Sequence, residues 1–171
     1  DYELDSNLSN VNASFWGECE YDFSGYSVAR AGDVNGDGYD DILIGADYND
    51  EGGDEAGQTY LIFGKASGLA MNTDLSDSDA SFWGESADDN SGISLAGAGD
   101  VNGDGYDDIL IGVRDNGEGG PDAGQTYIIF GKASGWSMDT NLSDSDASFL
   151  GERPYDKSGW SVAGAGDVNG D

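Results

Sequence analysis

The chain has 171 residues, of which 35 are acidic and 6 are basic, and its formal net charge of −29 repels nucleic acids and anionic membranes while attracting cations. It contains no histidine, the commonest general base of enzymes, and its single cysteine, Cys19, excludes a disulfide framework and a cysteine metal site. No stretch is apolar enough to span a bilayer.

In chain order, the dominant feature is a repeat with a period of 67 residues that needs no gap. The nonapeptide DVNGDGYDD at residues 33–41 returns unchanged at residues 100–108, and its first five residues occur again at 167–171. Self-similarity at a fixed period is typical of repeat architectures, so the whole chain is interpreted as copies of one structural unit.

Within one copy, four short apolar runs rich in β-branched and aromatic residues occupy residues 27–29, 42–44, 59–63 and 80–83. Clusters of glycine, aspartate, asparagine and serine separate them, and no segment has sustained helical periodicity. Four short strands per repeat predict an all-β fold of β-propeller blades, each with four antiparallel strands. The alternative, one turn of a β-solenoid, is disfavoured because the repeat of 67 residues is too long for it.

The repeat predicts about two and a half blades in this chain. Residues 1–22 are expected to form the outer strand of a preceding blade, and residues 157–171 the start of a further one, with complete blades at 23–89 and 90–156. Propeller rings usually contain about four to eight blades, so the segment needs further blades of the same or a neighbouring chain. Either the chain is cut from a longer array, or several copies assemble into a ring or a filament.

The repeated acidic nonapeptide has the ligand pattern of a calcium loop. Calcium prefers about six to eight hard oxygens, and Asp33, Asn35 and Asp37 place side-chain oxygens at alternate positions. The backbone carbonyl of Tyr39 and the carboxylate of Asp41 complete the predicted ligand set. The equivalent residues are Asp100, Asn102, Asp104, Tyr106 and Asp108 in the second copy, and Asp167, Asn169 and Asp171 in the third.

We expect one Ca²⁺ for each complete loop, hence two ions, and a third if the chain continues or a neighbouring molecule completes the third loop. A metal-free turn of Asp, Gly and Asn is the alternative for a single loop, but two unchanged copies in a gapless repeat disfavour it. EF-hand and dockerin loops are also disfavoured, because they have an acidic residue at loop position twelve. Here that position holds Ile44 and Ile111, within an apolar strand.

With these loops, the chain resembles the FG-GAP repeats of integrin alpha subunits and microbial surface proteins over essentially its full length. Residues 24–29 occupy the FG position, with Ser24 where the family commonly has phenylalanine. Residues 44–47 occupy the GAP position, with Asp47 in place of proline, and residues 112–114 of the second copy depart further. The calcium motif of the family, Asp-x-Asp/Asn-x-Asp-Gly-x-x-Asp, is matched in full at residues 33–41 and 100–108.

The resemblance implies a propeller in which calcium clamps the first hairpin of each blade on one face and recognition without catalysis takes place on the opposite face. It also implies a secreted or cell-surface protein that acts in adhesion. The departures at the FG and GAP positions leave the calcium motif intact, so they bear only on which ligand is recognised.

The loops on the face away from calcium hold much of the variation between copies, and loops on a rigid scaffold commonly carry recognition. Drift in unconstrained turns is the alternative explanation. The recurring aromatic residues, such as Trp16, Tyr60, Phe82 and Phe149, are interpreted as packing between blades rather than as a platform for sugars. The predicted ligand contacts are Tyr21, Tyr48, Arg114, Arg153 and Tyr155.

The sequence therefore predicts a calcium-binding, non-catalytic propeller segment for adhesion or recognition. Among 35 acidic residues some pair of carboxylates always lies at a catalytic distance, so such a pair is uninformative. Two alternatives stay open: a repeating structural subunit of an extracellular filament or surface layer, and a non-catalytic part of a larger secreted hydrolase. The expected partners are further blades and a protein or glycan ligand, with neither nucleic acid binding nor membrane insertion.

Overall fold

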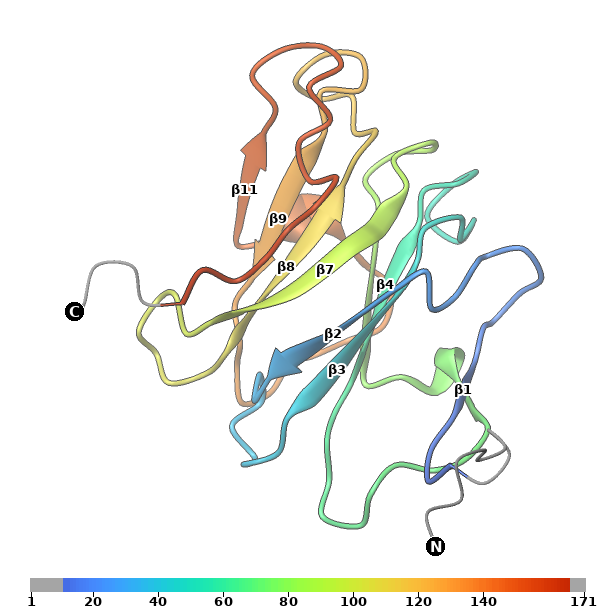
Figure 1. The fold of residues 1–171 in the computed structure, drawn as a ribbon, viewed down its shortest axis with the longest axis vertical. Helices are drawn as coiled ribbons and strands as arrows, with labels where there is room; N and C mark the ends of the chain where they lie inside the picture. Colours follow the sequence, from blue (N-terminus) through green and yellow to red (C-terminus); the bar gives the residue numbers. More distant parts are fainter. Residues whose placement is uncertain (1–10, 167–171) are drawn as a thin grey trace, which may run out of the picture.

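The computed structural model describes residues 11–166, which form β-sheets connected by loops, with two 3₁₀ helices of three residues each (Figure 1). The predicted all-β fold class is confirmed. The predictions for residues 1–10 and 167–171, including the third-loop ligands Asp167, Asn169 and Asp171, lie outside the described residues.

Two sheets, each with four antiparallel strands, lie side by side, in the orders β6-β4-β3-β2 and β11-β9-β8-β7, and a short fifth strand described below adds to the first in parallel (Figure 1). Each of the four predicted apolar runs falls in one strand of the first sheet and recurs in the second, except that the third strand ends at Ile62, one residue before its predicted end. The strands of the first sheet are β2 (Ser27–Gly32), β3 (Asp41–Ala46), β4 (Gln58–Ile62) and β6 (Ala80–Trp83), and those of the second are β7 (Ser91–Gly99), β8 (Asp108–Val113), β9 (Gln125–Ile129) and β11 (Ala147–Leu150).

The central strands β3 and β4 are buried along almost their whole length, because both faces of the sheet are covered. Leu43 and Leu61 belong to a core cluster that also contains Ile109 of the second sheet, whereas Ile44 and Tyr60 belong to a separate cluster. Neighbouring residues of one strand point to opposite faces of the sheet. The larger of the two clusters joins the two sheets.

Close contact between the sheets explains the glycine at the GAP position. A Cβ atom on Gly45 would collide with the carbonyl oxygen of Gly92, and one on Gly112 would collide with that of Gly159. Residues 157–166 therefore lie against the second sheet as β7 lies against the first, although no strand is assigned to them.

Two connections link the sheets at their outer edges. The sequence analysis predicted no structure in them. We call residues 64–79 and 131–146 the hooks. Each hook joins the third and fourth strands of one sheet. Between them it forms a two-residue strand that pairs in parallel with the outer strand of the preceding repeat. The hook elements are β5 (Thr73–Asp74) and η2 (Leu75–Asp77), which lie beside β1 (Phe15–Trp16), and β10 (Thr140–Asn141) and η3 (Leu142–Asp144), which lie beside β6.

The prediction that the recurring aromatic residues form the core is confirmed for Tyr60 and Phe82, which are buried. It is wrong for Trp16 and Phe149, each of which is 59% exposed. Phe149 occupies the same repeat position as Phe82, but no hook or further sheet covers it within residues 11–166. The difference in exposure between the two copies therefore reflects their neighbours.

Candidate functional site

The two acidic loops lie at the same end of the two sheets, where β2 connects to β3 and β7 connects to β8 (Figure 1). Asp33 directly follows β2 and Asp41 begins β3, so the first loop closes a hairpin. The loops that connect β3 to β4 and β8 to β9 lie at the opposite end (Figure 1). The two faces predicted for calcium and for recognition are thus separate.

Asp33 organises the first acidic loop. Its Oδ1 accepts hydrogen bonds from the backbone N–H groups of Gly36 and Asp37, at 2.8 and 3.0 Å, and its Oδ2 accepts one from Gly38 at 2.9 Å. Gly36 and Gly38 have φ angles of 76° and 88°, a left-handed conformation that glycine adopts without strain. The backbone therefore wraps around the Asp33 carboxylate.

Asn35 and Asp37 extend the same turn. The Oδ1 atom of Asn35 accepts from the Asp37 backbone N–H, and the Oδ1 atom of Asp37 accepts from the Tyr39 backbone N–H, both at 2.9 Å. The side-chain amide of Asn35 also donates to Asp37 Oδ2 at 3.1 Å. The structure thus gathers Asp33, Asn35 and Asp37 into one turn.

Asp41 is fully buried at the start of β3 and holds the loop to the rest of the sheet. Its Oδ2 accepts from the Val34 backbone N–H at 2.9 Å, and its Oδ1 accepts from that of Gly64 at 2.8 Å. Burial raises the pKa of Asp41 to about 6, these two donors oppose the rise, and the charges of Asp37 and Asp33 add to it. The other loop carboxylates therefore act on Asp41 electrostatically.

The second acidic loop repeats this geometry. Asp100 accepts from the backbone N–H groups of Gly103, Asp104 and Gly105, at 2.7, 3.1 and 2.8 Å. Asp108 is also buried, and its pKa is likewise raised, first of all by burial. The remaining equivalent bonds join Asn102 to Asp104, Asp104 to Tyr106, and Asp108 to Val101 and Gly131.

The donor set fits a hard cation such as Ca²⁺, because every predicted side-chain ligand is an oxygen. A carboxylate offers about four lone-pair positions. Asp33 uses three of them in the hydrogen bonds above, and Asp37 and Asp41 use two each, so all three keep capacity for a cation. Within residues 11–166, no three Asp, Glu, Cys or His side chains are grouped closely enough to hold a metal.

The two acidic loops also contact each other, which the sequence did not indicate. The backbone N–H of Asp33 donates to Asp107 Oδ2 at 2.8 Å, and the backbone N–H of Asp107 donates to the Asp33 carbonyl at 3.2 Å. Asp40 holds the same position in the first loop, but its carboxylate pairs with exposed Arg30 at 2.6 Å. Loop position eight therefore has different partners in the two copies.

We expect Asp107→Ala to lower the free energy of unfolding by about 1–2 kcal/mol, because it leaves the N–H of Asp33 without its partner. Asp40→Ala is the matched control, since it removes the same side chain from the same loop position but affects only an exposed ion pair. Urea unfolding of both variants in excess chelator measures the difference without a contribution from bound calcium. Equal stability of the two variants would rule out a structural role for the contact between loops.

The five predicted ligand contacts differ in how far their side chains are exposed. Tyr21 and Tyr155 are 81% and 67% exposed, and Arg153 is also exposed. Tyr48 is half-buried and makes an edge contact with Phe23, at 5.2 Å between ring centroids. Four of the five residues thus present surface at the end of the sheets away from the acidic loops.

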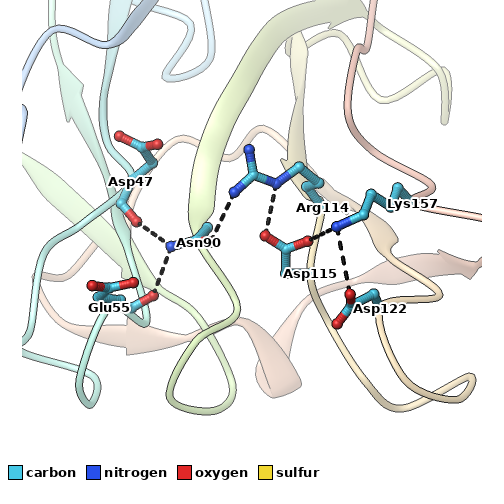
Figure 2. A network of polar contacts seen from close by, with 7 residues as sticks. All are labelled: Asp47, Glu55, Asn90, Arg114, Asp115, Asp122 and Lys157. Atoms are coloured by element: carbon cyan, nitrogen blue, oxygen red, sulfur yellow. Dashed lines mark hydrogen bonds and ion pairs between the residues drawn. The ribbon is translucent and has the colours of Figure 1, made fainter. Parts of the chain in front are cut away.

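Arg114, the fifth predicted contact, has internal partners (Figure 2). Its Nη2 donates to Asn90 Oδ1 at 3.0 Å, its Nε pairs with Asp115 Oδ2 at 2.7 Å, and its guanidinium lies 5.2 Å from the centre of the Trp160 ring. The side chain is therefore held at the junction between blades, and sequence variation alone did not reveal this role.

Figure 2 shows that two junctions, one between the two sheets and one between the second sheet and residues 157–166, use different chemistry at one repeat position. In the first junction, the side-chain amide of Asn90 donates to the carbonyls of Asp47 and Glu55, at 3.2 and 3.3 Å. In the second, Lys157 occupies the position of Asn90 and pairs with the carboxylates of two residues of the preceding blade. These are Asp115, at 2.6 Å, and Asp122, at 3.5 Å.

We expect Lys157→Met to destabilise the protein at low ionic strength by less than about 1 kcal/mol, because the lysine pair is partly exposed. The effect is expected to vanish near about 1 M salt, where charges are screened over roughly 3 Å. Lys65→Met, at an exposed lysine without an ion pair to any described residue, is the control. Urea unfolding at both salt concentrations measures this effect. A loss of stability that does not depend on salt would contradict the assignment of an ion pair to Lys157.

Comparisons with known proteins agree with this architecture. The FG-GAP repeat family matches residues 24–62 and 91–129. Integrin alpha-PS2 of Drosophila melanogaster is 31% identical over 96% of this chain, and integrin alpha-6 of Gallus gallus is 32% identical over 78% of it. Phosphatidylinositol-glycan-specific phospholipase D of Bos taurus is 31% identical over 97% of the chain.

The matched regions are small parts of these relatives. The chain covers 12% of integrin alpha-PS2, 11% of integrin alpha-6 and 19% of the phospholipase. In the part of the chain that the structure describes, there is no helix with the length and apolar character needed to cross a membrane.

Proposed function

Because this chain belongs to the FG-GAP repeat family, we propose that it is a calcium-binding, non-catalytic propeller segment of a secreted or cell-surface protein that acts in adhesion or recognition. The observation that carries the proposal is the acidic loop, which has the same hydrogen-bond geometry in both copies. The motif Asp-x-Asp/Asn-x-Asp-Gly-x-x-Asp, matched in full at residues 33–41 and 100–108, supports calcium as the ion.

In this proposal, each loop holds one Ca²⁺ through its two aspartates, its asparagine, the tyrosine carbonyl and the buried aspartate that begins the next strand. The ion would neutralise clustered negative charge. The chain's own contribution is to preorganise the oxygens through backbone donors and to join the loops of neighbouring blades through Asp107. The site is structural, because it closes the first hairpin of each blade.

Recognition is proposed for the opposite end, at Tyr21, Tyr48, Arg153 and Tyr155. Three of these side chains are exposed and lie on loops that differ between copies, a common arrangement for recognition on a rigid scaffold. Arg114 contributes by holding the junction beneath them. The ligand class is a protein or glycan surface.

Further blades are the second proposed partner. Val28 of β2 is 67% exposed, whereas Leu95, its repeat equivalent in β7, is 8% exposed because the first sheet covers it. Tyr26 and Ile93 differ in the same way, at 58% and 7%. The first sheet thus exposes an apolar face that matches a face buried at the existing junction, and it needs a neighbour from the same or another chain.

Exposed apolar side chains occur on both sheets, at Tyr26 and Val28 of the first and at Phe149 and Leu150 of the second, and they favour the alternative of a repeating subunit in an extracellular filament or layer. The phospholipase relative supports a further alternative, a non-catalytic part of a larger secreted hydrolase. Sedimentation in calcium separates the first alternative from an adhesion module: a polymer that grows with concentration favours the filament, and discrete particles favour the module.

Adhesion is tested by applying the calcium-loaded protein to arrays of extracellular matrix proteins and glycans. We expect binding that disappears in a triple variant with Tyr21→Ala, Arg153→Ala and Tyr155→Ala. A variant with Tyr39→Ala, altered at the opposite end, is the control and should bind normally, because a carbonyl ligand does not depend on the side chain. Equal binding of the triple variant and the parent protein would refute the proposed recognition surface.

A further inference from the structure

The two hooks attach to the outer strands of the preceding sheets through the same reciprocal pair of hydrogen bonds. Ser81 Oγ donates to Asp139 Oδ1 at 3.1 Å, and the backbone N–H of Asp139 donates back to Ser81 Oγ at 2.7 Å. In the first hook, the corresponding bonds join Ser14 and Asn72, at 3.2 and 2.8 Å. Ser14 and Ser81 are equivalent positions of the repeat.

The hook residues have the types that this attachment demands. Asn72 and Asp139 have φ angles of 56° and 60°, a left-handed conformation that Asn and Asp tolerate better than other residues with a side chain. At this position the short polar side chain also accepts the serine hydroxyl. The attachment therefore selects Asn or Asp for two separate reasons.

Further contacts join the second hook to the first sheet. The Ser81 backbone N–H donates to the Ser137 carbonyl at 3.2 Å, and Gln58 Nε2 donates to Asp139 Oδ1 at 3.3 Å. The Trp136 ring meets Phe82 edge-on, at 6.4 Å between centroids. The hook thus combines a short parallel strand, a polar contact and an aromatic anchor.

β11 is the third outer strand in this series, and within residues 11–166 nothing pairs with its free edge. Phe149 is 59% exposed, whereas its equivalent Phe82 is 3% exposed under the second hook. Ser148, the equivalent of Ser14 and Ser81, is exposed. Gln125, the equivalent of Gln58, is 98% buried, and within residues 11–166 no hook lies beside it to accept from its side-chain amide as Asp139 does from Gln58.

We propose that the free edge of β11, with Gln125, Ser148 and Phe149, is a binding site for the hook of a further FG-GAP repeat. This inference rests on the proposed function in one respect, namely that the chain works together with further blades. The occupant adds a parallel strand to an exposed edge, a mode of recognition in which backbone bonds give affinity and side-chain pockets give specificity. It needs Asp or Asn opposite Ser148 and a bulky apolar residue opposite Phe149.

The chemistry of the site agrees with a hook rather than with an arbitrary acidic peptide. The donors that meet the Asp or Asn side chain are a hydroxyl and an amide, which are neutral, so charge attraction contributes little to the recognition. Specificity instead comes from the left-handed residue and the aromatic anchor, which occur together in residues 136–139. An acidic peptide without this pattern lacks both features.

The test uses the isotope-labelled protein in calcium and a synthetic peptide with the sequence of residues 131–146. We expect saturable NMR shifts of the backbone amides of Ser148 and Leu150 and of the side-chain amide of Gln125, with a dissociation constant of about 1 mM or tighter. A peptide with Asp139→Ala, or a protein with Ser148→Ala, should bind about tenfold more weakly. The peptide variant loses the side-chain acceptor of the serine hydroxyl and of the glutamine amide, and the protein variant loses both bonds of the reciprocal pair.

Ser148 is exposed, so its substitution is not expected to disturb folding, and this keeps the test interpretable. Absence of shifts at millimolar peptide, shifts confined to other strands, or equal binding of the Asp139→Ala peptide would overturn the inference. Calorimetric titration of calcium into the same sample separates this inference from the proposed function. Calcium binding without peptide binding refutes the hook site alone, and peptide binding without calcium binding refutes the calcium site alone.

Discussion

Removal of calcium is expected to lower the melting temperature of this protein by roughly 10–20 °C. Binding at about 100 times the dissociation constant stabilises a protein by about 2.7 kcal/mol per site, and two complete loops are present. For a protein of this size, 1 kcal/mol corresponds to about 2–4 °C in melting temperature. Without the ion, the carboxylates of Asp33, Asp37 and Asp41 are left to repel one another in each hairpin.

The measurement is a thermal melt followed by circular dichroism, in calcium and after excess chelator. Magnesium at the same concentration is the control for screening by any divalent cation, because it fits a flexible loop with many oxygen ligands poorly. We expect magnesium to restore only a small part of the lost stability. An unchanged melting curve in excess chelator would show that no structural metal is present.

The second large effect is expected from single aspartates of the loops. Asp37→Ala and Asp104→Ala should each weaken calcium binding at one site by at least about 100-fold, because they remove a charged ligand. Asp40→Ala should change affinity little, since the Asp40 side chain points to Arg30 and lies outside the ligand set. Isothermal titration calorimetry resolves the loss as one remaining tight site in each of the first two variants.

Asp40 is the right control for this series and Asp107 is not, although both occupy position eight of their loops. Asp107 contacts the backbone of Asp33, so its removal disturbs a ligand of the neighbouring loop indirectly. Equal losses of affinity in Asp37→Ala, Asp104→Ala and Asp40→Ala would show that general negative charge, rather than the assigned ligands, attracts calcium.

Much of the fold follows from short-range features of the sequence. The four apolar runs lie in strands because β-branched and aromatic residues fill sheets covered on both faces, as in β3 and β4. The turn of the acidic loop is equally local, since the carboxylate of Asp33 accepts from residues within five positions of it. Both features can therefore be predicted from one copy of the repeat, and the second copy supports the prediction.

The hooks were missed because their contacts are not local. β5 and β10 are two residues long, and their partners lie on an outer strand almost one repeat earlier in the chain, as with Ser14 and Asn72. No periodicity appears in so short a strand. One signal was available: residues 75–82 recur unchanged as residues 142–149 outside the calcium loop, which indicated a constrained connection.

Arg114 shows a different limit of sequence reasoning. It differs from Asp47 of the first copy, and such variation was interpreted as a sign of ligand contact. The structure places Arg114 against Asn90, Asp115 and Trp160 instead. Two copies can differ because they meet different ligands or because they meet different neighbouring blades, and composition alone does not distinguish these causes.

The most direct test of a calcium-clamped blade is a high-resolution crystal structure of the protein grown in millimolar Ca²⁺. The account predicts one strong density peak per loop, at about 2.3–2.6 Å from the oxygens of Asp33, Asn35, Asp37, Tyr39 and Asp41, and an equivalent peak in the second loop. Peaks that refine as water, with the hydrogen bonds of the loops unchanged, would contradict it.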